Sequence, residues 1–159
     1  MKAVSKIVGW HIDRNLIEGA TDMGQYKKLM SEFGEYSDND AQGACKKDDI
    51  GDMGVVVINI ASRNGIVNEL LSNPFTIHHE GYTELLESLF NVGITVLEES
   101  KHFYLESLTG ALVNLWETLS SIAQENGYTL EECLEHAYNS IKDRKGRLIN
   151  GTFVKESDL

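Results

Sequence analysis

The sequence predicts an all-α protein, folded as a helical bundle of about five main helices. The chain has 159 residues and one proline, and it is rich in Leu, Glu, Ile and Ala, which favour helices over strands. Its apolar residues recur at the i, i+3, i+4, i+7 spacing that places them on one face of a helix. A chain of this length, with 42% apolar residues, is predicted to form a single domain over residues 1–159 with a buried core.

Residues 1–21 are expected to form an arm or a short helix that lies against the body. The first main helix is predicted to begin at a cap provided by Thr21 or Asp22 and to run to about residues 36–38. Its apolar stripe consists of Tyr26, Leu29, Met30 and Phe33. A polar linker over residues 37–47 then leads to the second helix.

The second helix is predicted from about Asp48 to Asn64, with Gly65 as its C-terminal stop. Its middle, residues 54–61, reads GVVVINIA and has the β-branched composition of a buried strand. The apolar pattern continues for about four turns, longer than a typical strand, and therefore favours a helix. We predict a helix pair over about residues 22–65, whose second member is buried on most sides.

A connector is predicted over residues 66–80, with a short helical turn near residues 67–71. Helical spacing of apolar residues then returns over about residues 81–99 and again over about residues 105–126. These two segments form a predicted second helix pair in the middle of the chain.

The second helix pair resembles the first. The segment YTELLESLFNV at residues 82–92 aligns with YKKLMSEFGEY at residues 26–36, and Ile122–Gly127 echoes Ile60–Gly65. The middle of the chain, about residues 80–127, is therefore either a degenerate repeat of the first pair or an insertion that resembles it by chance. In this alignment the acidic positions of the first pair become Ser88, Asn91, Ala111 and Asn114.

The last helix is predicted from Thr129 to about residue 145, and Glu132 completes a capping box at its start. It ends in the only strong basic cluster of the chain, which consists of Lys142, Arg144, Lys145 and Arg147. This cluster either compensates the negative end of the helix dipole or holds a phosphate group, for which Lys and Arg are suited. The remaining tail is expected to run extended over the body.

Two carboxylate pairs in the first helix pair suggest a metal site. Glu32 and Glu35 are three residues apart, as are Asp49 and Asp52, so each pair lies on one helix face. Two such helices side by side would bring the four acids together, where Mg²⁺, or Mn²⁺ as a substitute, would offset their repulsion. The simpler alternative is a solvated acidic face, but carboxylates beside so apolar a helix would be costly to bury unpaired.

Two further residues are predicted near these acids. Lys28 lies four positions before Glu32 and is placed to pair with it, or to contact a phosphate. Asn59 lies seven positions after Asp52, on the same helix face. The five histidines show no zinc-like spacing with cysteine, and we expect them at the surface.

The bulk properties exclude several classes of protein. A net charge of −11 argues against binding to nucleic acid polymers, and no apolar run approaches the roughly 20 residues of a membrane span. Without a recognisable signal peptide, the protein is expected to be cytoplasmic. Cys45 and Cys133 are expected to be free thiols there, with a disulfide as the less favoured alternative. No phosphate-binding glycine loop or dinucleotide fingerprint is present.

These residues resemble the MazG-like all-α nucleoside triphosphate pyrophosphohydrolases, in particular the short phage-type members. The family motif EExxE, a spacer, then ExxD, is matched by Ser31–Glu35, thirteen intervening residues and Asp49–Asp52. Ser31 stands where the family has Glu, and Asp49 stands where it has Glu. The resemblance covers about residues 10–66 and 127–159.

The resemblance implies an enzyme that hydrolyses nucleoside triphosphates (NTP or dNTP) to the monophosphate and pyrophosphate, which would clean the nucleotide pool. It also implies a homodimer or a higher homo-oligomer. Two alternatives stay open: a catalytically inactive helical module that binds nucleotide or protein, and an enzyme restricted to dUTP or dCTP. The family pattern assigns Mg²⁺ to Glu32, Glu35, Asp49 and Asp52, the phosphate tail to Lys28, Lys142, Arg144 and Lys145, and the sugar or base to Asn59.

Overall fold

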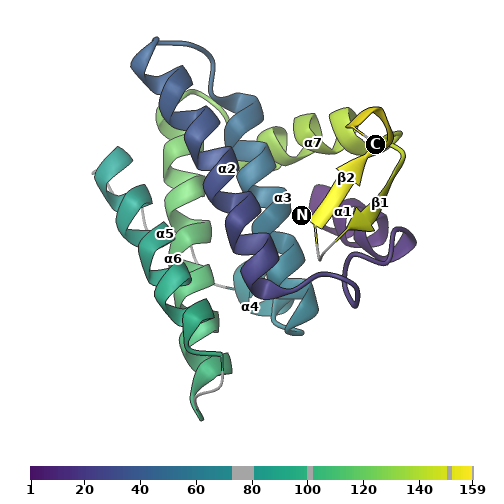
Figure 1. Ribbon diagram of the computed structural model, residues 1–159. Helices are drawn as coiled ribbons and strands as arrows, with labels where there is room; N and C mark the ends of the chain where they lie inside the picture. Colours follow the sequence, from purple (N-terminus) through teal and green to yellow (C-terminus); the bar gives the residue numbers. More distant parts are fainter. Residues whose placement is uncertain (73–80, 100–101, 150–151, 159) are drawn as a thin grey trace.

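The computed structural model describes residues 1–72, 81–99, 102–149 and 152–158 and is mostly helical (Figure 1). Its helices are α1 (Lys2–Asp13), α2 (Asp22–Ala41), α3 (Lys47–Arg63), α4 (Val67–Ser72), α5 (Gly81–Leu97), α6 (Tyr104–Glu125) and α7 (Leu130–Ile141). Strands β1 (Gly146–Ile149) and β2 (Thr152–Lys155) form an antiparallel hairpin, and a single 3-10 turn (Glu156–Asp158) follows. The predicted all-α class is confirmed apart from this hairpin, which replaces the expected extended tail.

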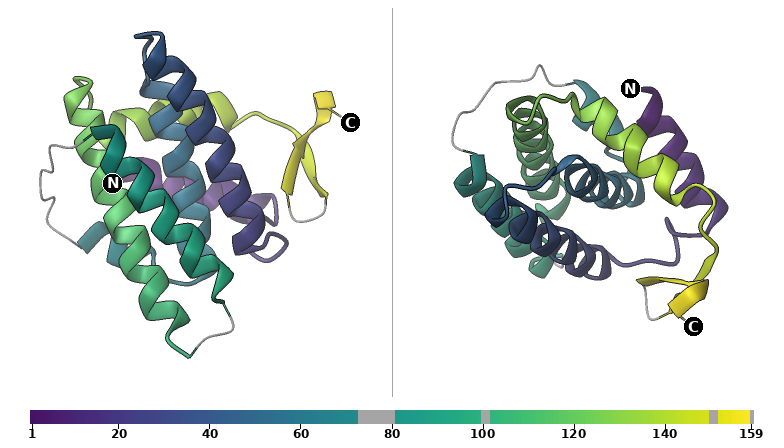
Figure 2. Two further views of the ribbon diagram at one scale, coloured as in Figure 1. Left: turned by 60° about the vertical axis from the view of Figure 1, so that its left-hand side comes forward. Right: turned by 90° about the horizontal axis from the view of Figure 1, so that it is seen from above.

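Helix α3 lies at the centre of the bundle and contacts α1, α2, α6 and α7 (Figure 2). Every residue from Met53 to Ala61 is buried, so the β-branched run is a buried helix, as its length predicted. Helix α5 packs against α6 and α2, on the side of the bundle away from α1 (Figure 1). Because helices of the same chain cover α3, its burial does not need the second copy that an exposed apolar helix would have required.

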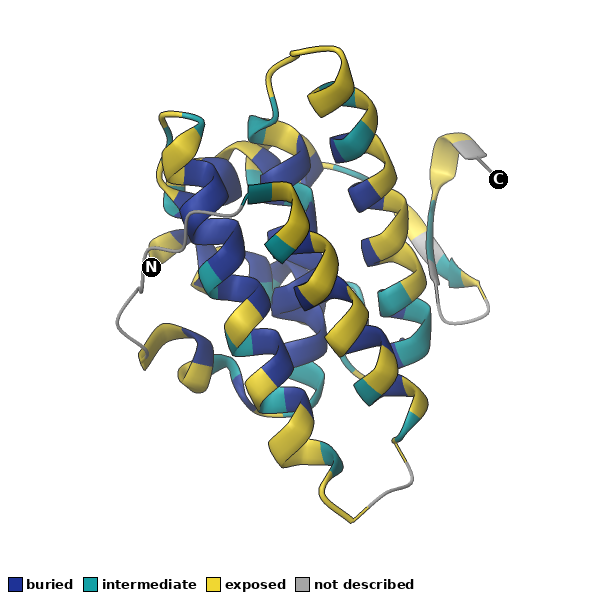
Figure 3. Cartoon of the chain, turned by 90° about the vertical axis from the view of Figure 1, so that its left-hand side faces the viewer, coloured by how far each residue is buried: buried dark blue, intermediate teal, exposed yellow. Residues whose placement is uncertain are grey.

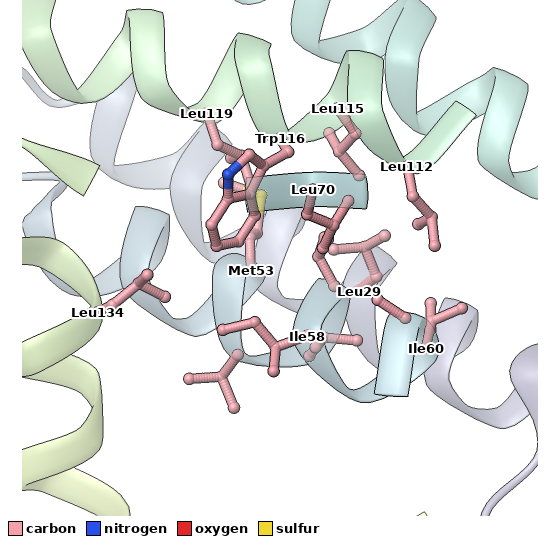
Figure 4. Packing of buried hydrophobic residues seen from close by; sticks show 14 of the residues in the cluster. Leu29, Met53, Ile58, Ile60, Leu70, Leu112, Leu115, Trp116, Leu119 and Leu134 are labelled. Atoms are coloured by element: carbon pink, nitrogen blue, oxygen red, sulfur yellow. The ribbon is translucent and has the colours of Figure 1, made fainter. Parts of the chain in front are cut away.

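The core between these helices is formed by large aliphatic side chains around Trp116 (Figure 4). Trp116 is 1% exposed, and Leu29 of α2, Met53 of α3 and Leu112 of α6 are fully buried. Burial of each such side chain is worth about 1.5–3 kcal/mol, so this cluster holds α2 and α3 side by side. Buried residues line the inward faces of the helices, and exposed residues cover their outer faces (Figure 3).

Helix α2 is longer than predicted. It begins at Asp22, where the Thr21 hydroxyl accepts a hydrogen bond from the backbone N–H of Gly24, and it continues to Ala41. Near its end, the amide of Asn39 donates to both carboxylate oxygens of Asp49, at 3.1 and 2.8 Å. This contact ties the last turn of α2 to the first turn of α3, which the local sequence pattern did not reveal.

Helix α7 starts with the predicted capping box but ends at Ile141, earlier than the predicted residue 145. The guanidinium of Arg14 donates hydrogen bonds to the carbonyl oxygens of Lys142 and Arg144, at 3.0 and 3.3 Å. These two carbonyls are therefore engaged outside a helix, and the chain turns toward β1. The basic cluster consequently lies after the helix and not on its last turn.

A partly buried polar cluster around Asp22 joins the far ends of α2, α3 and α6. The carboxylate of Asp22 accepts hydrogen bonds from Arg63 (2.9 Å), Asn64 (2.9 Å) and the Tyr104 hydroxyl (2.7 Å). Burial and the Asp22 carboxylate raise the pKa of Tyr104, so its hydroxyl stays a donor. This cluster fixes the end of α3 that lies away from the predicted acids.

Helices α3 and α6 end in the same way, as the proposed repeat would require. The amide of Asn64 donates to the carbonyl of Ile60 at 2.9 Å, and Asn126 donates to Ile122 at 2.8 Å. Each helix is followed by a glycine with positive φ, 71° at Gly65 and 80° at Gly127. The two helix pairs thus share their stop signals, and the duplication itself stays a prediction.

The remaining connections follow the sequence reading. Helix α1 packs against α7 and α3, so residues 1–21 do lie against the body. Helix α4 confirms the short helical turn of the connector, whereas Pro74 and His78-His79 lie outside the described residues. None of the helices in the described part of the chain has the length and apolar character that a bilayer crossing needs.

Helices α3 and α7 approach each other closely at two glycines. A Cβ atom added at Gly51 would overlap the carbonyl oxygen of Cys133 and lie 2.9 Å from the Cβ of Ala137. At Gly54 it would lie 2.7 Å from the side chain of Leu134. The glycines therefore set the separation of α3 and α7 on either side of Asp52.

Candidate functional site

A pocket of about 390 Å³ opens between α1, α2, α3 and the chain that follows α7. Its floor is one face of α3, where the lining residues are spaced at i, i+3, i+4 and i+7. This floor consists of Asp52, Val55, Val56 and Asn59. The walls consist of Trp10, His11, Leu16, Gln25, Lys28, Glu32, Ile141, Arg144, Phe153, Val154 and Lys155. The pocket thus unites five predicted site residues, which are Lys28, Glu32, Asp52, Asn59 and Arg144.

One end of the pocket carries two carboxylates. Glu32 of α2 is only 4% exposed and forms an ion pair with Lys28, as the four-residue spacing predicted. Burial, together with the carboxylates of Glu32 and Asp48, raises the pKa of Asp52 to about 7, although Arg144 and Lys28 oppose the rise. A cation at this end of the pocket would relieve the repulsion that raises the pKa of Asp52.

The other two predicted acids lie outside the pocket. Asp49 is buried and held by Asn39, and burial raises the pKa of Asp49 although this hydrogen bond opposes the rise. Glu35 is exposed on the next turn of α2 after Glu32. Among the described residues, no three His, Cys, Asp or Glu side chains gather closely enough to hold a metal ion. Two of the predicted metal ligands have other partners in this conformation: Glu32 pairs with Lys28, and Asp49 accepts hydrogen bonds from Asn39.

Of the predicted basic residues that follow α7, the structure places Arg144 in the pocket wall. Lys142 and Lys145 are exposed and do not line the pocket, and the ammonium of Lys142 lies 3.2 Å from the side-chain oxygen of Asn139. Lys155 of β2 does line the pocket, and the sequence reading missed it. The signal that would have found it is Asn150-Gly151, a dipeptide typical of hairpin turns, between two β-branched or apolar runs.

Two residues that line the other end of the pocket, Asn59 and His11, each carry a buried polar atom, Oδ1 and Nδ1, for which the described residues provide no hydrogen-bond partner. Asn59 is 1% exposed, and its amide nitrogen donates to the carbonyl of Leu16 at 3.3 Å, which leaves Oδ1 facing away from that bond. His11 is 2% exposed, so the expectation of a surface histidine is wrong at this position. Burial lowers the pKa of His11 to about 3, and the ring is neutral at pH 7.

Aromatic side chains surround this second end. The indole N–H of Trp10 donates to the carbonyl of Ile141 at 3.1 Å, and its ring lies edge-on to Phe153 with centroids 5.7 Å apart. The guanidinium of Arg14 lies over the same indole, 4.7 Å from the ring centroid. The pocket therefore has a charged end at Asp52 and a largely apolar end whose lining includes Asn59 and His11. Seven residues of α3, about 10 Å, separate Asp52 from Asn59.

Both cysteines are free, with Cys45 exposed and Cys133 buried. Neither cysteine lines the pocket.

The raised pKa of Asp52 predicts a stability that depends on pH. In the unfolded chain this carboxyl ionises near its ordinary pKa of 3.8, so between about pH 4 and pH 7 the folded state holds a proton that the unfolded state has lost. The loss of folding stability that ionisation of Asp52 causes is therefore absent below about pH 4 and complete above about pH 7. Its upper bound is about 4 kcal/mol, and partial exposure of the side chain reduces this to about 2 kcal/mol.

Urea unfolding of the wild type and of Asp52→Asn at pH 4, 5.5 and 8 measures this loss. We expect Asp52→Asn to gain stability relative to the wild type as the pH rises, since the amide cannot ionise. A difference between the two proteins that stays constant from pH 4 to pH 8 would contradict the raised pKa.

The chain is similar to an uncharacterized 18.2 kDa protein in the rep-hol intergenic region of Haemophilus phage HP1 (strain HP1c1), with 42% identity over 65 residues. The match covers 40% of this chain and 40% of the phage protein. No protein-family model matches the chain, and no solved structure matches it.

Proposed function

We propose that this protein hydrolyses nucleoside triphosphates to the monophosphate and pyrophosphate with the help of Mg²⁺, as the resemblance to MazG-like enzymes implies. The observation that carries the proposal is one pocket in which Glu32 and Asp52 stand beside Lys28, Arg144 and Lys155. The carboxylates would attract a metal cation, and the Lys and Arg side chains would attract an anionic group, so the pocket suits an anion that binds together with a metal ion. A polyphosphate with its divalent ion has this character.

The residues at the charged end fit Mg²⁺. This ion is commonly held by one or two carboxylates while it keeps several waters and substrate phosphates, so Glu32 and Asp52 suffice as protein ligands. Asp49 and Glu35 lie one turn away along their helices, as the predicted second carboxylate of each pair. When bound, the metal would lower the pKa of a water molecule and neutralise charge on the phosphoryl oxygens. Mn²⁺ prefers the same oxygen ligands and would substitute for Mg²⁺.

The basic residues of the pocket would hold the phosphates. Arg144 and Lys155 come from the chain after α7, and Lys28 would exchange its ion pair with Glu32 for a phosphate oxygen. Held in this way, the triphosphate presents its α-phosphate at the carboxylate end, where water attack releases pyrophosphate. Lys142 and Lys145, which do not line the pocket, are assigned a secondary role near the phosphate tail.

The apolar end would bind the base. The orientation of the Asn59 amide is fixed by Leu16, which leaves a buried acceptor for an N–H group of the ligand. The neutral His11 ring offers a second hydrogen-bonding atom, and Trp10 offers an apolar surface. A site with buried polar groups discriminates strongly between ligands that do and do not satisfy them, which favours a base-restricted enzyme such as a dUTP or dCTP pyrophosphatase.

One observation favours the rival proposal, a non-catalytic module that binds nucleotide. Lys28 already compensates Glu32, and Asn39 already engages Asp49, so these two acids are satisfied without a metal. Such a module would be stabilised by nucleotide in a thermal-shift titration without releasing pyrophosphate. An interaction module for another protein would show neither effect.

The experiment is an assay of pyrophosphate and orthophosphate release with a panel of NTPs and dNTPs, in Mg²⁺ and in EDTA. The proposal expects pyrophosphate from at least one nucleotide in Mg²⁺ and no release in EDTA. Orthophosphate as the product, or undiminished activity in EDTA, would refute it. Thermal-shift titration with the same panel separates the enzyme from the nucleotide-binding module.

The setting of this activity is also a proposal. We expect the protein to act on free nucleotides in the cytoplasm, because a net charge of −11 disfavours nucleic acid polymers. The homodimer implied by the family resemblance is an expectation that light scattering tests directly.

A further inference from the structure

Helix α5 exposes a row of large apolar side chains on its outer face. These side chains, here called the α5 stripe, recur every three or four residues and therefore lie on one side of the helix. Their exposed fractions are 41% for Tyr82, 43% for Leu86, 64% for Phe90, 45% for Ile94 and 74% for Leu97. Figure 3 views the bundle from the side on which α5 and α6 lie.

The α5 stripe is not part of the core. The core-facing side of the same helix consists of Leu85, Leu89, Val92 and Val96, all of which are buried. Helix α5 is thus apolar on two sides. Within the described residues, α2 covers the outer side at Tyr82, whose ring contacts those of Phe33 and Tyr36, while the rest of the stripe stays exposed. Single exposed apolar residues are normal, but a continuous row of them marks a surface that binds another molecule.

Helix α2 packs along one side of α5. It packs against α5 where Gly93 leaves room for the ring of Tyr26, and Met30, one turn further along α2, is 37% exposed. Beside Phe90, the surface forms a shallow depression lined by Leu86, Glu87, Phe90 and Asn91. The stripe therefore offers apolar contact over the length of α5, which at 17 residues is about 25 Å long.

Helices α5 and α6 carry charge of a single sign, whereas the neighbouring α2 also carries the exposed Lys27. Helices α5 and α6 contain no Lys, Arg or His, whereas they contain Glu84, Glu87, Glu106, Glu117 and Glu125. A second copy of the chain would bring the same acidic helices to the contact, and like charges across an interface are costly. A partner with Lys and Arg beside its apolar residues would instead be attracted to this surface.

We propose that the α5 stripe binds an amphipathic helix of a partner protein that carries apolar residues at four-residue spacing and basic residues on both flanks. An amphipathic helix in an apolar groove is a common mode of recognition, and a partner of about five turns matches the length of α5. None of the stripe residues lines the pocket that contains Asp52. Binding of a partner at the α5 stripe therefore does not depend on the proposed enzymatic activity.

The test uses two synthetic helical peptides of eighteen residues that share one Leu stripe, one flanked by Lys and the other by Glu. Fluorescence anisotropy with the full chain should show binding of the Leu/Lys peptide and not of the Leu/Glu peptide. Phe90→Ser should weaken that binding by about tenfold or more, since a central apolar contact is lost. Glu87→Gln should weaken it less and should reduce its dependence on salt.

Ile12→Ser is the matched control, because Ile12 is 62% exposed, nearly as much as Phe90, but lies on α1. It should leave peptide binding unchanged, which separates the stripe from general attraction to an acidic protein. Equal binding by wild type and Phe90→Ser, or equal binding of the two peptides, would overturn the proposal. A dimer in light scattering that Phe90→Ser converts to a monomer would also overturn it, because a second copy would then occupy the stripe.

Discussion

Asp52→Asn is expected to slow pyrophosphate release strongly while making the folded protein more stable at pH 8. The substitution keeps the size of the side chain and removes the charge that would hold Mg²⁺ at the floor of the pocket. A metal contributes several kcal/mol to charge stabilisation in such reactions, so we expect a loss of about a hundredfold or more in kcat. The free energy of unfolding should rise, because the environment of Asp52 disfavours its ionised form, as its pKa of about 7 indicates, and an amide cannot ionise.

The opposite signs of these two effects make the result specific. A variant that loses activity because it unfolds would lose stability as well. Asp38→Asn is the matched control, since it also removes one carboxylate but lies exposed on α2 and away from the pocket. Initial rates and urea midpoints for the three proteins suffice, and full activity of Asp52→Asn would remove Asp52 from the site.

Gly51→Ala is expected to destabilise the fold by about 3 kcal/mol, the upper end of the usual cost of overpacking. The added methyl group would overlap the carbonyl oxygen of Cys133 and crowd the Cβ of Ala137, which only a movement of α3 away from α7 can relieve. Since Arg144 follows α7 and faces Asp52, the same movement would separate the two sides of the pocket. Chemical unfolding of the purified variant measures the loss.

Two other glycine-to-alanine substitutions give the controls. At Gly54 the new methyl group would meet the flexible end of Leu134, so the loss should be smaller. At Gly34, in α2, nothing lies within 4 Å, and alanine should stabilise the helix by about 0.5–1 kcal/mol. The expected order of stability is Gly34→Ala, wild type, Gly54→Ala, Gly51→Ala. A Gly51→Ala protein as stable as the wild type would show that α7 does not pack as described.

Helix positions could be predicted from sequence because they depend on local periodicity and caps. The long β-branched run of α3 was assigned by its length alone, and Thr21 and Thr129 marked the starts of α2 and α7. The ends of α2 and α7 were misplaced because they depend on contacts with distant residues. Asn39 engages Asp49 across a turn, and Arg14 engages the carbonyls beyond Ile141.

The candidate site could be predicted only in part for the same reason. The four-residue spacing correctly paired Lys28 with Glu32, and the seven-residue spacing placed Asn59 on the face of Asp52. They gave no information about the relative rotation of α2 and α3, which places Glu32 in the pocket and leaves Glu35 exposed. His11 and Lys155 reach the pocket from segments far from α3 in sequence, where no local pattern relates them.

The pairing of α1 with α7 has a consequence for cooperativity. The backbone N–H of Ala3 bonds to Glu131, the ammonium of Lys6 to Glu135 and the indole of Trp10 to Ile141, across 128, 129 and 131 positions of the chain. Closing so long a loop costs conformational entropy, and contacts between residues close in sequence do not offset it. These hydrogen bonds therefore form only once the core has assembled. One wall of the pocket therefore has no independent stability. Any ligand that fills this pocket is coupled to the folding equilibrium of the whole chain.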